Sequence, residues 1–443
     1  MKYFKPLFLS TLGFLFFLFP FDIMGENRIA IAHILSFITK NYLDEFLIFT
    51  EVISWIVLTM TLIFIFFTSR ITTLNKVFKA SPLNVILRLT GSFLYLMVIH
   101  EWFGDYKWSK LLIDPNTGGV MAGEGGLLTT LYVTFFVGLM AMPLLTHFGA
   151  VEFIGSLFGK SMKKIFKVPG YAAVDAIASF VGDGTIGILV TDQQYKRGYY
   201  TQKEAYIIAT NFSIVGIAFA TAVAEELGIS HIFPQFYASI AIITIIIAAI
   251  TARCPLKKFK NTYYQGVQTH LDQDSMPKSS VKKAIDVAVQ AASKASLKTA
   301  LKASLLNVTN TYVGFLPVIM TVGTLGLVLA ENTPLFEILS FPFQYLYTWM
   351  GFASASVSSM APASIAGLAD MYLPALFMVD VASEQARFFI GTLSFTQLVF
   401  LSETGMILVK TSIGITLWDV IKIFFYRTLL SIPLLWALTL LFA

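Results

Sequence analysis

An aspartate between two glycines is the most unusual polar residue of this 443-residue chain. Asp183 lies in the run Gly182-Asp183-Gly184-Thr185, in the middle of an otherwise apolar stretch, residues 170–197. The glycines permit a sharp reversal, so the stretch is expected to enter a membrane and return as a hairpin. A carboxylate at that depth costs at least roughly 2.5 kcal/mol unless it faces water, an ion or a polar solute. Asp183 is therefore a candidate for solute binding or ion coupling; the alternative is that it only caps the returning helix.

A second apolar stretch, residues 351–380, contains a cluster of small and hydroxyl side chains around a proline. Pro362 is expected to break the helix. Ser359 and Ser364 would then lie at the tip of a second hairpin, which carries hydroxyls and no charge. The alternative is that the small residues only allow close packing of helices.

Polar side chains also occupy the first half of the apolar segment that follows each stretch. The first segment carries Thr210, Asn211 and Ser213, and the second carries Thr392, Ser394, Thr396 and Gln397. Hydroxyl and amide oxygens are suitable ligands for Na⁺ or for a polar solute, whereas the alternative role is hydrogen bonding between helices. Glu403 lies deeper in the second segment and is a candidate proton carrier or cation ligand. Thr201-x-x-Glu204 precedes the first segment and predicts a capping box, a structural role.

The composition places these residues in a membrane protein. The chain is 56% hydrophobic and 13% charged, against about 25% charge in a soluble domain. The single cysteine, Cys254, excludes an intramolecular disulfide, and the five histidines form no HExxH-like pair. No nucleophile–base set stands out, so we expect neither an enzyme nor a metal site. The net charge of +5 bears on orientation in the membrane and is no evidence for nucleic acid.

The predicted fold class is an all-α polytopic membrane protein with about nine transmembrane helices and two re-entrant helical hairpins. The predicted spans are residues 5–24, 47–69, 84–104, 125–147, 205–228, 231–252, 304–329, 385–409 and 424–443. Lys167 and Lys196 flank the first hairpin stretch, and Lys and Arg are absent between Lys302 and Arg387. Since basic residues stay on the cytoplasmic side, the hairpin at 170–197 enters from the cytoplasm and that at 351–380 from outside. The N-terminus is then cytoplasmic, and the first span is retained rather than cleaved as a signal peptide.

Shifting the chain by 180 residues superimposes these unusual elements in the same order. Because the two hairpins enter from opposite faces, the halves form an inverted repeat, which is a signature of secondary transporters. The expected organisation is an N-terminal scaffold (1–124), a first repeat (125–252), a cytoplasmic linker (253–303) and a second, inverted repeat (304–443). The linker contains a basic amphipathic helix that is expected to lie on the inner leaflet.

Three features together resemble the YjiH-like membrane proteins, which carry the Gate, or nucleoside-recognition, domain. They are the early GFLFFLFP run at 13–20, the Gly182–Thr185 turn and the layout in two units. Gate domains are similar in layout to the concentrative nucleoside transporters, which are cation-coupled elevators that hold solute and sodium at the hairpin tips and at breaks in the following spans. The resemblance implies solute binding by Gly182, Asp183, Gly184, Thr185, Ser359, Ala361, Ser364, Asn211 and Gln397. It implies ion coupling by Asp183, Asn211, Ser213, Thr392 and Ser394, and the depth of Glu403 in its segment adds that residue as a further candidate for ion coupling. The Gly-Asp-Gly-Thr tip departs from the Gln/Thr/Glu-type polar set of nucleoside transporters, so the nucleoside itself stays open as a substrate.

The sequence thus predicts a cation-coupled, elevator-type secondary transporter of a small polar solute that is nucleoside-like or amino-acid/peptide-like. The expected coupling ion is Na⁺ or H⁺, with no other cofactor. The expected location is the bacterial inner membrane, where the chain forms a homo-oligomer and binds no nucleic acid. The alternative is a Gate-type channel or a partner subunit of a larger complex. The chain has no GxxxxGK[ST] loop, so in that case another polypeptide would supply the energy.

Overall fold

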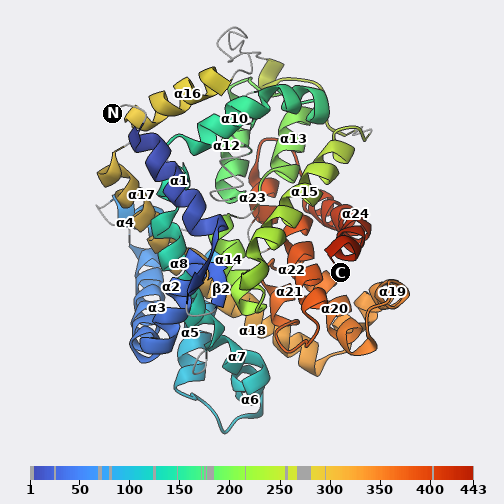
Figure 1. Cartoon of the computed structure of the whole chain (residues 1–443). Coiled ribbons are helices and arrows are strands. Elements are labelled where there is room, and N and C mark those ends of the chain that lie inside the picture. Colours follow the sequence, from blue (N-terminus) through green and yellow to red (C-terminus); the bar gives the residue numbers. More distant parts are fainter. Residues whose placement is uncertain are drawn as a thin grey trace.

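The computed structural model shows a bundle of helices that runs through the whole chain, with a single two-stranded sheet in the part described (Figure 1). The structure describes the chain except for residues 1–3, 24–25, 68–71, 79–81, 123–125, 147, 171, 174–175, 177–183, 215, 255–257, 267–280, 295, 402–403 and 443. Several of its helices are long and apolar enough to cross a membrane. The prediction of an all-α polytopic membrane protein is confirmed.

The N-terminal part of the chain is helical apart from one β-hairpin. Its elements are α1 (Phe4–Leu18), β1 (Pro20–Ile23), β2 (Glu26–Ile29), α2 (Ala30–Asn41), α3 (Leu43–Phe66), α4 (Thr72–Phe78), α5 (Pro82–Ile99), α6 (Lys107–Ile113) and α7 (Val120–Ala122). The predicted first span, 5–24, is too long, because α1 ends before Pro20, which has no N–H to continue the helix. The chain instead forms an antiparallel pair in which Pro20 lies opposite Ile29.

The predicted first repeat, residues 125–252, begins with α8 (Leu127–Ala141), α9 (Pro143–Thr146) and α10 (Ala150–Ser161). The later helices of that repeat are α12 (Gly184–Lys196), α13 (Gln202–Asn211), α14 (Ile217–Glu226) and α15 (Phe233–Thr251). The linker contributes α16 (Val281–Lys294). The predicted second repeat, residues 304–443, comprises the later part of α17 (Leu297–Asn310), and then α18 (Leu316–Asn332), α19 (Leu335–Trp349), α20 (Ser354–Ala366), α21 (Leu373–Leu376), α22 (Glu384–Gln397), α23 (Thr404–Lys410) and α24 (Leu417–Phe442).

Five helical segments of the described chain are long and apolar enough to span a bilayer. They are Leu43–Phe66, Pro82–Ile99, Ser230–Thr251, Leu297–Leu329 and Leu417–Thr439, and they coincide with the predicted spans 47–69, 84–104, 231–252, 304–329 and 424–443. The last two begin about seven residues earlier than predicted. The extra residues are the more polar first turns, which hydropathy alone does not assign to a span.

The two segments that follow the hairpin stretches are each interrupted rather than continuous. Residues 205–228 divide into α13 and α14, with the described residues 212–214 and 216 outside any helix. Residues 385–409 divide into α22 and α23, with residues 398–401 outside any helix. The breaks come directly after Asn211 and Gln397, the polar residues that the sequence singles out. This matches the broken spans that the family resemblance implies.

The second hairpin stretch turns later than its sequence predicts. The helix α20 continues through Pro362 to Ala366, and the chain leaves helical geometry at 367–372 before α21 begins. The prediction that Pro362 breaks the helix is therefore wrong. Proline removes one hydrogen bond, but residues 360–366 are buried, and surrounding helices can hold such a helix together. In the first hairpin stretch α12 begins at Gly184.

The basic linker helix α16 packs against α10 and contacts α1 (Figure 1). Its small residues face the bundle, since Ala284 and Ala292 are buried, and a Cβ at Gly149 would lie 2.4 Å from the Ala288 carbonyl oxygen. Ile285, which the sequence places on the same apolar stripe, is 40% exposed. The helix is thus anchored to the protein by alanines, and its contact with the inner leaflet stays a prediction.

Candidate functional site

A buried arginine joins the two broken segments. Arg427 lies on α24, ten residues after Leu417, or roughly 15 Å along the helix, and its side chain is 1% exposed. Its Nε donates to the carbonyl oxygen of Thr396 at 2.8 Å, and its Nη1 donates to the carbonyl oxygen of Thr210 at 3.2 Å. These carbonyls lie in the last turns of α22 and α13, where a helix leaves its C=O groups without partners. One guanidinium therefore satisfies backbone oxygens at both breaks.

Asn211 adds a second contact between Arg427 and the end of α13. Its side-chain oxygen accepts a hydrogen bond from Arg427 Nη1 at 2.9 Å, and its Nδ2 donates to the Ile207 carbonyl oxygen at 2.9 Å. The residue is 1% exposed. Its amide oxygen is thus held at the end of α13 and aimed at α24 rather than at the lipid.

Gln397 occupies the corresponding end of α22 and connects it to the second hairpin. Its Nε2 donates to the carbonyl oxygen of Ser364 at 2.8 Å and to Thr428 Oγ at 3.0 Å. Ser364 is held in turn, because its hydroxyl lies 2.6 Å from the hydroxyl of Tyr347. The carboxamide fits against Gly367, where a Cβ would lie 2.1 Å from Gln397 Oε1. A glycine at that position is what lets the hairpin approach α22.

The backbone after Gln397 turns sharply. Leu398 has φ +65° and ψ −33°, and the Val399 N–H donates to the Gln397 carbonyl oxygen at 2.8 Å. This i→i+2 bond is a γ-turn of the strained kind, which a bulky residue rarely adopts. Beyond it, the Leu401 N–H donates to the Leu368 carbonyl oxygen at 2.8 Å. The break after α22 and the turn after α20 are therefore hydrogen-bonded to each other.

Three buried polar atoms in this region have no hydrogen-bond partner in the structure. They are Arg427 Nη2, Gln397 Oε1 and Ser431 Oγ. Buried polar groups are normally paired, so these atoms are available to bind a polar solute. The cluster offers a donor on Arg427, an acceptor on Gln397 and a hydroxyl that can do either.

The structure brings together only part of the predicted site. The hydrogen-bonded network around Arg427 includes Asn211, Gln397 and Ser364. Two further predicted residues, Ala361 and Ser213, are buried and lie within three residues of this network along the chain. The hydroxyls of Thr392 and Ser394 donate to carbonyl oxygens of their own helix, Phe388 and Gly391, at 2.8 Å each. Ser359 is partly exposed on α20.

The proposed charged tip falls largely outside the described residues. Gly182 and Asp183 of that tip are not described, and neither is Glu403 of the later segment 385–409. Gly184 and Thr185 form the start of α12, where only the backbone is described. Their roles in binding and coupling stay predictions.

The structure also adds residues that the sequence analysis missed, above all Arg427 and its neighbour Thr428. Arg427 falls inside the predicted span 424–443, close to its start, where a basic residue reads as an ordinary cytoplasmic end. The signal that could have found it is the general cost of an ionisable side chain inside a span. With α24 beginning at Leu417, Arg427 lies on the third turn.

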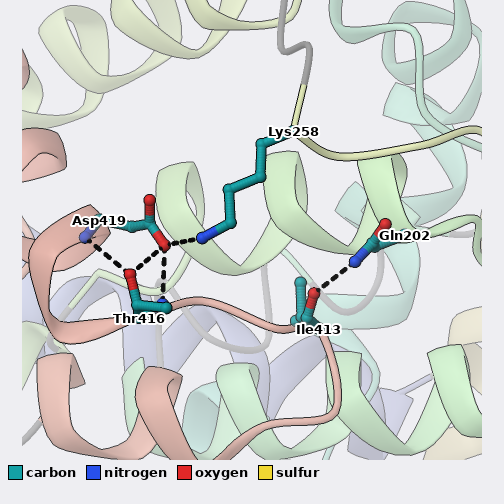
Figure 2. Close-up of polar contacts among 5 residues, drawn as sticks. All are labelled: Gln202, Lys258, Ile413, Thr416 and Asp419. Carbon is teal, nitrogen blue, oxygen red and sulfur yellow. Dashed lines mark hydrogen bonds and ion pairs between the residues drawn. The ribbon is translucent and has the colours of Figure 1, made fainter.

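At the end of the bundle where α13 and α24 begin, polar contacts tie the two repeats together (Figure 2). Asp419 accepts hydrogen bonds from Lys258 and from the Thr416 N–H, and Gln202 Nε2 donates to the Ile413 carbonyl oxygen at 2.9 Å. Close by, Asp192 on α12 accepts from the Ser412 N–H at 2.7 Å.

The predicted capping box at this same end is confirmed. The Thr201 hydroxyl accepts from the Glu204 N–H, and the Glu204 side chain accepts from the Thr201 N–H. Elements of the predicted first repeat are bonded to the segment before α24 at one end, through Asp192 and Gln202, and to α24 itself deeper in the bundle, through Arg427.

Residues 128–230 match a family model described as Gate, nucleoside recognition. This range contains α13 and its break. An uncharacterized protein of Alkalihalophilus pseudofirmus is 34% identical over 434 residues, covering 96% of this chain and 92% of that protein. Among solved structures, CNTnw in an inward-facing substrate-bound state shows 14% identity and a TM-score of 0.45, over 98% of this chain and 97% of that one. The YdaH transporter of Alcanivorax borkumensis shows 10% identity and a TM-score of 0.23, over 99% and 96% of the two chains.

Proposed function

Because the chain belongs to the same family as the Alkalihalophilus protein and carries a Gate domain of nucleoside recognition, we propose that it is a secondary transporter of a small polar solute. A nucleoside-like compound is the first candidate, and an amino-acid- or peptide-like compound is the second. The transporter lies in the inner membrane of a bacterium with its N-terminus in the cytoplasm, and an ion gradient, of H⁺ or Na⁺, drives it. Family membership also indicates that the chain is not an enzyme.

One observation carries this proposal: two helix breaks, one in each repeat, meet at a buried polar cluster. Non-helical backbone within a membrane-spanning bundle is stable only where protein or a wet cavity surrounds it. Broken helices at a repeat interface offer free backbone groups to a solute. Here the last turns of α13 and α22 both accept hydrogen bonds from Arg427, and Arg427 Nη2 and Gln397 Oε1 have no hydrogen-bond partner among the described residues. This combination suits a neutral solute with hydroxyl or amide groups.

The contacts between the repeats support alternating access by movement of a single body. Asp192, Gln202 and Arg427 each link the first repeat to the second through hydrogen bonds. The moving body would comprise α12, α13, α20 and α22 to α24, and both hairpins would travel with it. The N-terminal helices, with α17 and α18, would form the scaffold.

Uptake by purified protein in proteoliposomes tests the proposal. Labelled nucleosides, amino acids and dipeptides are offered with an inward H⁺ gradient, with an inward Na⁺ gradient, or with neither. We expect gradient-dependent accumulation of at least one class, and loss of that uptake in Gln397→Leu, which removes both amide functions at similar size. Gln290→Leu, at an exposed position of α16, is the matched control. A protein that is folded and inserted yet moves no compound under any gradient would contradict the proposal and favour a partner subunit.

A further inference from the structure

We infer that Arg427 is a built-in cation: its guanidinium fills the place between the two helix breaks that a coupling Na⁺ would otherwise take. The inference deepens the proposed function, and only its consequence for transport rests on that function. The hydrogen bonds of Arg427 to oxygens at the ends of α13 and α22 support it.

The oxygens around Arg427 form a cation-binding set. The Thr210 and Thr396 carbonyls and the Asn211 side-chain oxygen are all acceptors, and all three already receive hydrogen bonds from Arg427, at 3.2, 2.8 and 2.9 Å. Carbonyl and amide oxygens are also the groups with which proteins bind hard cations. A Na⁺ at this place would have to remove these hydrogen bonds or share the oxygens with a fixed positive charge.

The charge of the site also fits one cation and not two. A helix C-terminus carries about half of a negative elementary charge, and α13 and α22 both end here. Together they amount to about one negative charge, which the guanidinium balances. In the described part of the chain no carboxylate forms a hydrogen bond or an ion pair with Arg427. The helix ends are therefore the partners that the structure provides for this buried charge.

Two consequences follow. Transport by the wild-type protein does not depend on Na⁺ bound at Asn211, so a Na⁺ gradient does not drive it through this site. Removal of the positive charge leaves three oxygens and two helix ends directed at an empty position, and Na⁺ can then bind there.

The test measures Na⁺ binding without requiring transport. Thermal unfolding of the purified full chain is followed in NaCl and in KCl at equal ionic strength. We expect equal midpoints for the wild type and for Arg427→Lys, which keeps the charge. For Arg427→Met, which keeps the length without the charge, we expect a saturable, Na⁺-specific rise of about 2 °C or more. A folded Arg427→Met variant without a response to Na⁺ would overturn the inference.

If Arg427→Met fails to fold, thermal unfolding of the wild type in NaCl and in KCl tests whether Na⁺ binds at this place. A saturable Na⁺-specific rise in wild-type stability that Asn211→Ala abolishes would also overturn the inference. In proteoliposomes, the initial uptake rate of the wild type should agree within about twofold in Na⁺ and K⁺ buffers at a fixed H⁺ gradient. A protein that transports nothing refutes the proposed function, whereas the two unfolding experiments still report on Arg427.

Discussion

The contact between Gly367 and Gln397 gives a sharp test of the site. Gly367 ends α20 with φ −57°, an ordinary helical value, so alanine is not strained there by its backbone. The obstacle is the neighbour, because the new Cβ would lie 2.1 Å from Gln397 Oε1. Ordinary contact begins near 3.4 Å, so the carboxamide must move by about 1.3 Å (3.4 − 2.1).

That displacement breaks the two hydrogen bonds of Gln397 Nε2, to the Ser364 carbonyl and to the Thr428 hydroxyl. Each is worth about 1 kcal/mol, and a buried donor left without a partner costs about 1–3 kcal/mol in addition. A loss of roughly 3–5 kcal/mol is expected. Replacing glycine by alanine restricts the unfolded chain and returns about 0.4–1 kcal/mol. The net expectation for Gly367→Ala is a destabilisation of roughly 2–4.5 kcal/mol.

Unfolding of the purified protein measures this difference, and a double-mutant cycle assigns it. In a Gln397→Ala background the clash is absent, so Gly367→Ala should be neutral or slightly stabilising there. Gly159→Ala is a suitable control, because its nearest atom would be an ordinary 3.4 Å away. Equal effects of Gly367→Ala in both backgrounds would refute the proposed seating of Gln397 against the hairpin.

Three further outcomes are expected. Asp183→Asn should abolish uptake while expression survives, and wild-type rates in that variant would remove Asp183 from the mechanism. Asp419→Ala removes the side chain that accepts from the Thr416 N–H and from Lys258 at the start of α24 and should lower the free energy of unfolding by about 1 kcal/mol, whereas Asp286→Ala, at an exposed position of α16, should change it little. In a cysteine-free background, cysteines introduced at Arg197 and Asp380 should react with impermeant reagents only from the cytoplasmic and only from the outer side, respectively. Labelling of both from one side would exclude the inverted topology.

Hydropathy was sufficient to locate most membrane segments, because long apolar helices are recognised by composition alone. The ends of helices were less predictable. The helix α24 begins at Leu417 and α17 at Leu297, in turns polar enough to read as loops. The β-hairpin after α1 was missed because residues 20–29 show no alternation strong enough to indicate strands.

The sequence indicates which polar residues line the site, but it does not indicate which residues they contact. Asn211 and Gln397 stand out as amides in apolar segments, and the structure places both at helix breaks. Pro362 was overvalued as a helix breaker, whereas the helix ends after Ala366, beside Gly367. No local pattern shows that Arg427 reaches two helices more than 30 and 200 residues away in the sequence, because such contacts depend on tertiary packing.

Shared dependence on Arg427 has a consequence for how selectivity can change in this protein. A substitution at Asn211 alters the support of the guanidinium, and the guanidinium in turn holds the Thr396 carbonyl of the other repeat. The two halves of the molecule therefore cannot adapt to a new solute independently. Variants with altered preference should arise as compensating pairs, with one change in each half, more readily than as single substitutions.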